Sequence, residues 1–289
     1  MNVLEVEGIT KKFKDFCLND ISFSLPAGYI MGYVGKNGAG KTTTLNIITG
    51  LLHATSGTVR IDGITIQEDP IRYKEMIGFI GDTSFFPDDF TGKEVIRTLR
   101  DFYPSFNEQK FRAYMKEWDL PENKKISQFS KGMQVRLMFA DILSRDTKIL
   151  ILDEATNGLD PVIKDEILTL MQEYISDGKR SILFSTHILS DLEQIADYIF
   201  FIDEGEKVMC ESKEEMVDSF LLLKTGPEDL TDELSSKIIG LKKTEVMAEG
   251  LIRADDAVYF TGNVTLEKPS VDQIVIHYIL ERGKERVLQ

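Results

Sequence analysis

GKNGAGKT, at residues 35–42, is the stretch that decides the predicted fold, because it matches the pattern GxxxxGK[ST]. An apolar run at residues 29–34 precedes it, and the residues after it read as a helix. The sequence therefore predicts a strand, a glycine-rich loop and a helix in direct succession. This is the local structure of a phosphate-binding loop.

The residue types in this loop have the chemistry that phosphate binding needs. Glycines let successive backbone N–H groups point at phosphate oxygens, and the positive end of the following helix faces the same place. We expect Lys41 to reach the β- and γ-phosphates, Thr42 to ligate Mg²⁺ and Thr43 to lie near the α-phosphate. The residues predicted to bind nucleotide here are Gly35, Asn37, Gly38, Ala39, Gly40, Lys41, Thr42 and Thr43. A glycine-rich turn can match this pattern by chance, so a second motif is needed.

A second apolar strand supplies that motif. ILILDE, at residues 149–154, ends in the acid pair of a Walker B element. We expect Asp153 to hold the magnesium, through water, and Glu154 to polarise the attacking water as a general base. The two motifs together predict a chain that binds ATP and Mg²⁺.

Strand-like and helical segments alternate along the chain. A third apolar strand, residues 181–186, ends at His187. Such alternation predicts an α/β fold with a parallel sheet, whose ligands lie beyond the carboxyl ends of the strands. Residues 83–145 look mostly helical, and their aromatic side chains recur at helix-like intervals, which is typical of core positions. Those side chains are Phe102, Phe106, Phe111, Tyr114 and Trp118.

The character of the sequence changes after residue 210. An acidic stretch and the short strand FLLL are followed by a helix-like DELSSKII, strand-like TEVMAEGLI and AVYFTG, and a final helix that begins at Ser270. We therefore predict two domains, residues 1–210 and a small α+β accessory domain at residues 211–289.

Composition excludes several classes of protein. The 289 residues are 42% hydrophobic, enough for a core, and carry a formal charge of −14, which argues against nucleic-acid binding or attachment to anionic lipids by bulk charge. No run of about 18 apolar residues is present, and the amino terminus lacks the features of a secretory signal. The two cysteines and three histidines lack metal-ligand spacing. These observations predict a cytoplasmic protein.

Three further strings place the chain near a known family. FSKGM at residues 129–133, NGLD at 157–160 and STH at 185–187 occur in order with the two motifs above. Together the five resemble the ABC (ATP-binding cassette) ATPases over roughly residues 1–210. The resemblance implies a P-loop NTPase fold of the ABC type, with a helical subdomain at about residues 83–145.

The resemblance also implies roles for residues outside the two first motifs. Ser130 and Gly132 would contact nucleotide held by a second ATPase subunit, so that two cassettes sandwich two ATP molecules, with Asp160 at their interface. His187 would contact the γ-phosphate and position Glu154 and water. Phe13 would stack on adenine; its alternative is a core phenylalanine, and Phe16 is a rival for the role.

Three positions depart from the family pattern. Lys131 and Met133 replace a glycine and a glutamine of the signature, which we expect to retune closure of the dimer. Asp82 stands where a glutamine usually reaches magnesium. Either its carboxylate ligates Mg²⁺ in a site of altered charge, or it turns away and serves as the hinge of the next loop.

The function implied is that of a cytoplasmic ATPase subunit acting at the inner face of the membrane through a separate transmembrane permease subunit. The carboxyl-terminal segment resembles those of ABC-2 type bacterial exporters of drugs, peptides or similar compounds. Residues 83–90 are expected to help form a groove for an intracellular helix of the permease, or else to pack internally. Two alternatives are a soluble ABC ATPase in translation, DNA repair or cluster assembly, and an ATP-sensing regulator.

Overall fold

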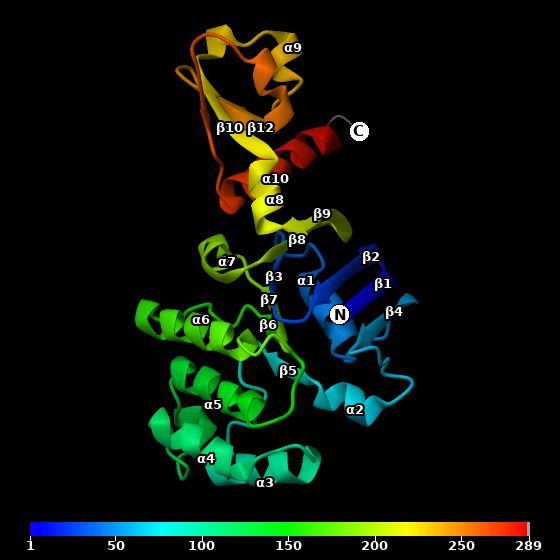
Figure 1. The fold of residues 1–289 in the computed structure, drawn as a ribbon, viewed down its shortest axis with the longest axis vertical. Coiled ribbons are helices and arrows are strands. Elements are labelled where there is room, and N and C mark those ends of the chain that lie inside the picture. Colours follow the sequence, from blue (N-terminus) through cyan, green and yellow to red (C-terminus); the bar gives the residue numbers. More distant parts are fainter. Residues whose placement is uncertain (288–289) are drawn as a thin grey trace.

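The computed structural model describes residues 1–287, with side chains through Lys284, and shows an elongated molecule (Figure 1). Helices α3 to α5 form one end, two sheets form the middle, and a third sheet with the last helix forms the other end. Within residues 1–287, the sheets have three, six and four strands.

The inner strands of the central sheet are predominantly apolar and buried, whereas the edge strand β9 is mostly polar. Every residue of β3 and β7 is buried, as expected where helices or a second sheet cover both faces. The strands are parallel except for β9, which pairs antiparallel with β8. In order across the sheet they are β5 (Ile77–Ile80), β6 (Ile149–Asp153), β7 (Ser181–Ser185), β3 (Ile30–Val34), β8 (Tyr198–Asp203) and β9 (Glu206–Ser212).

An antiparallel sheet packs on one face of the central sheet. It contains β1 (Asn2–Lys12) between β2 (Cys17–Pro26) and β4 (Ser56–Ile61). Aromatic side chains fill the space between the two sheets: Tyr33 stacks on Phe200 with ring centroids 4.7 Å apart, and Phe23 tilts against both. This layer fixes the position of β3, the strand that leads into the glycine-rich loop.

Helices within residues 92–195 cover the other face of the central sheet and extend beyond it, whereas the helices at residues 41–48 and 70–75 pack with the antiparallel sheet. Phe111 is fully buried, and Phe106, Tyr114 and Trp118 pack against the same core, but Phe102 is 74% exposed, so its prediction as a core residue was wrong. No helix in residues 1–287 has the length and apolar character needed to cross a membrane. The helices of this part are α1 (Lys41–Ile48), α2 (Pro70–Glu75), α3 (Gly92–Phe102), α4 (Glu108–Glu117), α5 (Lys131–Leu143), α6 (Pro161–Ile175) and α7 (Leu189–Ile195), with a 3₁₀ turn at Ile126–Gln128.

The last part of the chain forms an antiparallel sheet against α10. Its strand order is β11 (Ile239–Lys243), β12 (Ala248–Arg253), β10 (Phe220–Thr225) and β13 (Val264–Glu267). The helices are α8 (Lys213–Asp218), α9 (Asp232–Ser235) and α10 (Val271–Val287), with 3₁₀ turns at Pro227–Asp229 and Ala254–Tyr259.

Two element predictions in this part were wrong. AVYFTG, predicted as a strand, has its first three residues in the 3₁₀ turn Ala254–Tyr259 and none in a strand, and the end of DELSSKII leads into β11 rather than continuing a helix. The final helix begins at Val271, directly after the predicted Ser270. Its first N–H donates to Glu193 Oε1 of α7 (2.7 Å), so α10 is joined to the central part. The division at residues 210 and 211 stays a prediction.

A buried ion pair joins α5 to the edge of the central sheet. Arg145 Nε donates to Asp141 Oδ1 (2.8 Å), and both side chains are at most 3% exposed. Burial raises the pKa of the Asp141 carboxyl, and Arg145 opposes that shift. The guanidinium also donates to the Ile77 carbonyl (3.4 Å) and lies over the Tyr103 ring.

We expect Asp141→Ala to lower the free energy of unfolding by about 3–5 kcal/mol, because it leaves the Arg145 charge buried without its partner. Asp146→Ala is the matched control, since Asp146 pairs with Lys148 with its side chain 76% exposed, and it should cost less than about 1 kcal/mol. Urea denaturation of both variants measures the difference. If both variants lost the same free energy of unfolding, the conclusion that the buried ion pair stabilises the fold would be contradicted.

Candidate nucleotide-binding and hydrolysis site

The glycine-rich loop leaves β3 at Val34 and leads into α1, as the sequence predicts. Gly38 and Gly40 have φ of +80° and +110°, a backbone region that favours glycine. Gly35 is required for a different reason, because a Cβ on it would lie 2.3 Å from the Ile202 carbonyl oxygen. The loop can therefore pass close to β8 and present its N–H groups at the start of α1.

Lys41 is held inside this loop. Only 5% of the residue is exposed. Its Nζ donates to the carbonyls of Gly35 (2.7 Å) and Lys36 (3.2 Å). Burial lowers the pKa of the Lys41 ammonium, while Glu154 and Asp153 raise it. The same ammonium is thus within electrostatic range of both acids of the second motif.

Thr42 and Asp153, 111 residues apart in sequence, are in direct contact. The Thr42 hydroxyl donates to Asp153 Oδ2 (2.9 Å). Asp153 Oδ1 is buried without a hydrogen-bond partner, as are Asn157 Oδ1 and Ser185 Oγ nearby in the fold. Such orphaned oxygens are rare unless a ligand completes them. A hydroxyl beside a carboxylate with a free oxygen fits Mg²⁺.

Most ligands of that metal would have to come from nucleotide or water. Within the described 287 residues, no group of three or more His, Cys, Asp or Glu side chains is arranged to hold a metal ion. Mg²⁺ is commonly bound through one or two protein groups together with substrate phosphates. The arrangement at Thr42 and Asp153 therefore suits an ion that arrives with ATP.

Glu154 and His187 meet at the carboxyl ends of β6 and β7. Glu154 has a φ of +57°, a strained conformation for a residue with a side chain, and its N–H donates to the Ser185 carbonyl (2.9 Å). Its Oε2 lies 2.9 Å from His187 Nδ1 and also accepts a hydrogen bond from the Asn157 amide. A carboxylate held on two sides can orient a water molecule and accept its proton.

A cavity of about 610 Å³ opens beside these groups. It is lined by Glu154, by residues of the glycine-rich loop and the start of α1, and by two aromatic rings, Phe13 and Phe16. Phe13 is 47% exposed, and its ring centroid lies 6.2 Å from that of Phe16. Both candidates for the adenine contact therefore face the same space, and the exposure of Phe13 argues against its alternative as a core residue.

Ser130 and Gly132 lie at the start of α5, outside this cavity. The Ser130 hydroxyl caps the helix by accepting from the Met133 N–H (3.3 Å). Asp160 caps α6 in the same way, with its carboxylate accepting from Val162 and Ile163 (both 3.1 Å). Ser130 and Asp160 are exposed. A role for Ser130 and Gly132 in nucleotide binding thus needs a second chain and stays a prediction.

Asp82 has a partner that the sequence did not indicate. Its carboxylate accepts from the Lys131 ammonium at the start of α5. The two predictions for Asp82, a magnesium ligand or a hinge, both stay open. Asn157, which donates to Glu154, is a second residue that had no predicted role, since the motif NGLD alone gives no sign of that contact.

Comparison with known proteins agrees with this geometry. Residues 18–157 match the family model described as ABC transporter. The ATP-binding protein YtrB of Bacillus subtilis is 30% identical over 204 residues, 71% of this chain and 70% of its own length. The bacitracin transport protein BcrA of Enterococcus faecalis is 34% identical over 71% of this chain and 68% of its own. A Nod factor export protein of Burkholderia lata is 30% identical over 86% and 84%.

Solved structures share the fold. The ATP-binding subunit of an ABC transporter aligns with a TM-score of 0.69 at 26% identity, over 74% of this chain and 91% of the other. A nucleotide-free cassette from another ABC transporter gives 0.65 at 21% identity, over 75% and 94%. The predicted P-loop NTPase cassette is thereby confirmed, and the chain belongs to the ABC transporter family as an ATP-binding subunit that hydrolyses ATP.

Proposed function

We propose that this chain drives a bacterial exporter by closing on a second ATPase subunit when ATP binds and reopening after hydrolysis. The contact of Thr42 with Asp153, beside the pair Glu154 and His187, is the observation that carries the proposal. These contacts place the phosphate loop and the candidate general base, Glu154, at the same edge of the sheet. Binding alone would not need the strained Glu154.

Each group at this edge has a distinct task in hydrolysis. Lys41 and the loop N–H groups bind the phosphates, and Phe13 or Phe16 supports the adenine. Thr42 and Asp153 would hold Mg²⁺, which neutralises charge that develops on the phosphates. Glu154 orients a water molecule and takes its proton, and His187 fixes the Glu154 carboxylate and faces the γ-phosphate.

The second subunit completes the site from outside. Ser130 and Gly132 begin a helix of 13 residues whose N-terminal N–H groups and dipole favour an anion. Because these residues are on the surface of their own chain, the γ-phosphate they serve is that of the other chain. Closure then depends on ATP in both subunits, which can be identical or different chains.

Relatives named for transport support the export role. Two of them carry names of bacitracin transport and Nod factor export, and a third, from Streptococcus pyogenes, that of lantibiotic transport. We infer that this chain also serves an exporter of drugs, peptides or similar compounds. Recognition of that compound would belong to a separate transmembrane subunit, which would hold this chain at the inner face of the membrane.

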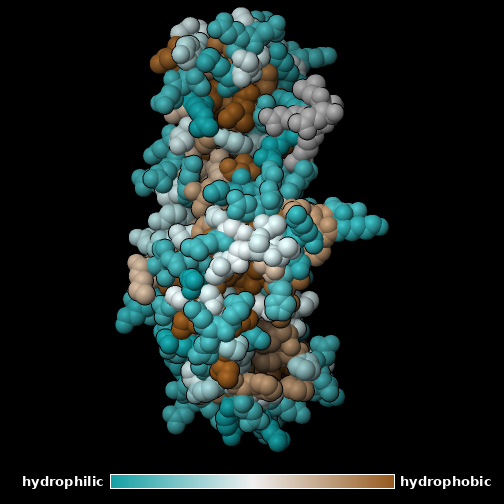
Figure 2. All heavy atoms as spheres, turned by 90° about the vertical axis from the view of Figure 1, so that its right-hand side faces the viewer, coloured by the Kyte–Doolittle hydropathy of each residue, from teal (hydrophilic) through white to brown (hydrophobic). Residues whose placement is uncertain are grey.

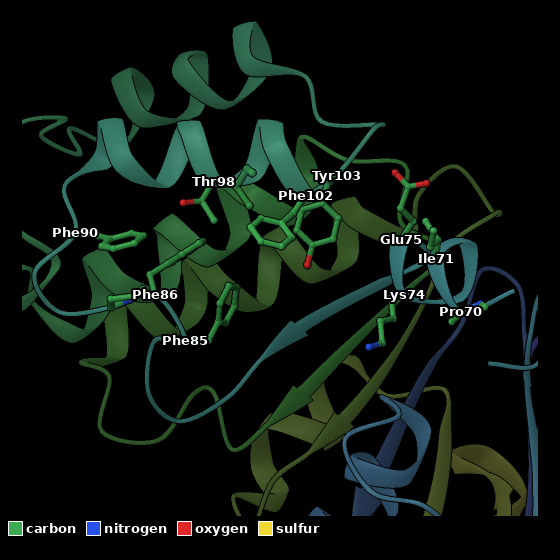
Figure 3. Close-up of a pocket in the computed structure, with 12 residues that line it drawn as sticks. Pro70, Ile71, Lys74, Glu75, Phe85, Phe86, Phe90, Thr98, Phe102 and Tyr103 are labelled. Carbon is green, nitrogen blue, oxygen red and sulfur yellow. The ribbon is translucent and has the colours of Figure 1, made fainter. Parts of the chain in front are cut away.

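An apolar groove between α2 and α3 is suited to that membrane subunit. It encloses about 430 Å³ and is lined by aromatic side chains of segment 83–90 and of α3. Figure 3 shows Phe85, Phe86 and Phe102 around this space, with Ile71 and Lys74 on its far side. Figure 2 shows apolar side chains around a hollow toward the same end of the molecule.

The exposed side chains of this groove can contact a partner protein, whereas the buried ones hold the exposed ones in place. Phe85 is 48% exposed, Phe102 74% and Ile71 70%, whereas Phe86 is only 6% exposed. Phe86 therefore packs internally and holds Phe85, whose ring centroid is 4.4 Å away. The exposed acids Asp88 and Asp89 lie beside the groove. A short intracellular helix with apolar and basic side chains has the matching chemistry.

Glu154→Gln should retain ATP binding but lower hydrolysis by about 10²-fold or more, because the amide cannot accept a proton. Without hydrolysis the closed state persists, so ATP should convert this variant into a dimer. Phosphate release and size-exclusion chromatography with and without ATP measure both effects. Glu117→Gln, on the exposed face of α4, is the control. Wild-type hydrolysis, or failure to dimerise, would count against the roles assigned.

Lys41→Ala should weaken ATP binding at least about tenfold, equivalent to about 1.4 kcal/mol, because it removes the cation that faces the phosphates. Titration with a fluorescent ATP analogue measures the affinity. Lys207→Ala, an exposed lysine of β9, is the charge-matched control and should bind as the wild type does. Equal affinities for the two variants would remove Lys41 from the site.

Phe85→Ala combined with Phe102→Ala should weaken binding of the membrane subunit and reduce the stimulation of ATPase activity by it, because both rings are on the surface of the groove. Activity of the isolated chain should not change. Tyr259→Ala, another exposed aromatic (55%), is the control. Unimpaired binding by a folded double variant would place the contact elsewhere.

A further inference from the structure

Two of the three positions that depart from the family pattern, Asp82 and Lys131, meet in space. Asp82 stands where the family has glutamine, Lys131 stands where it has glycine, and the two side chains form an ion pair across 49 positions of sequence. With the family residues at these positions, neither charge would exist. The two changes therefore have complementary consequences, which would not be expected of unrelated substitutions.

The start of α5 needs an anion from elsewhere. Lys131 is the first residue of this helix, and the first turn contains no acidic residue. A cation at a helix N-terminus is unfavourable, because the helix dipole is positive there. The Asp82 carboxylate, which comes from the end of β5, compensates both for the ammonium and for the dipole.

The same place is a junction of three segments. A Cβ on Gly132 would lie 3.2 Å from Ile163 of α6, so α5 and α6 approach closely here. A Cβ on Gly158, in the turn after β6, would lie 3.8 Å from the Lys131 ammonium. A shift of Lys131 would consequently move the helix start relative to the strands that carry the hydrolytic groups.

We propose that Asp82 and Lys131 are positioning residues whose ion pair fixes the first turn of α5, and with it Ser130 and Gly132, to the carboxyl end of β5. The effect on catalysis rests on the proposed function, in which Ser130 and Gly132 serve the nucleotide of the second subunit. The side chains are 34% and 58% exposed for Lys131 and Asp82, so water competes for the pair and it can open during the cycle.

Hydrogen exchange of the nucleotide-free chain tests whether the ion pair fixes the first turn of α5. Asp82→Asn and Lys131→Met should each speed amide exchange in residues 129–136 by about two- to fivefold, which is the range expected of a partly exposed pair. The double variant should exchange no faster than the faster single variant, because one broken partner already removes the contact. Lys224→Met is the matched control: Lys224 pairs with Glu267 and its side chain is 31% exposed.

Charge reversal provides an independent arm. Asp82→Lys alone places two ammonium groups together at the positive end of the helix dipole and should speed exchange further, whereas adding Lys131→Asp should restore the attraction and slow it again. This result would not follow if each residue acted separately. Mass spectrometry of the same peptide reports both variants.

ATP turnover by the isolated chain tests the catalytic part. Affinity for a fluorescent ATP analogue should be unchanged in Lys131→Met, because Lys131 lies outside its own chain's cavity, while kcat should fall by at least about twofold. The Asp82→Asn effect on kcat should shrink when Lys131 is already Met. Exchange that is unchanged, effects that multiply in the double variant, or an unchanged kcat would each overturn the proposal.

Different measurements test the role of this ion pair and the proposed function, so a failure of one can be told from a failure of the other. The exchange measurements need neither ATP nor a membrane partner, so they hold even if the chain serves no exporter. Conversely, a dimer that forms with ATP and a membrane subunit that stimulates turnover would support the proposed function whatever happens at Asp82 and Lys131.

Discussion

The parallel alignment of β3, β6 and β7 is the constraint on which the site depends. Backbone hydrogen bonds pair β3 and β6 with β7 on its two sides, so all three strands end at the same edge. Asp153 is the last residue of β6, and Lys41 and His187 follow β3 and β7. Groups more than a hundred residues apart thus reach hydrogen-bond distance because the sheet brings their strand ends together.

Charge at that edge is arranged for a polyanion within an acidic protein. The chain carries −14 overall, yet Lys41 and the start of α1 present positive charge to the cavity. Burial lowers the pKa of the Lys41 ammonium, and the nearby acids Glu154 and Asp153 oppose that shift. The phosphates of a bound triphosphate would face Lys41 and the loop N–H groups, and its divalent cation would face the acids. A triphosphate with a divalent cation therefore complements both sets of charges.

Local sequence predicted the parts of this site that are locally built. The glycine loop and the acid pair at the end of β6 follow from short patterns, as does, outside the site, the helix after Ser270. AVYFTG was misassigned, because its β-branched and aromatic residues have strand propensity while the chain there turns between β12 and β13. Phe102 fits the helical spacing of core residues, but its exposure depends on what packs against α3. The contact of Asp82 with Lys131 likewise could not be predicted from the sequence, because only the tertiary fold brings the two residues together.

A crystal structure of Glu154→Gln with ATP and Mg²⁺ tests the central claim most directly, namely that the edge of the sheet holds nucleotide between two chains. The account predicts two ATP molecules in a dimer, each with its phosphates on the Lys41 loop of one chain and facing Ser130 of the other, and with Thr42 and Asp153 beside the metal. A monomer with ATP bound and Ser130 facing solvent, or ATP bound away from Lys41, would contradict it.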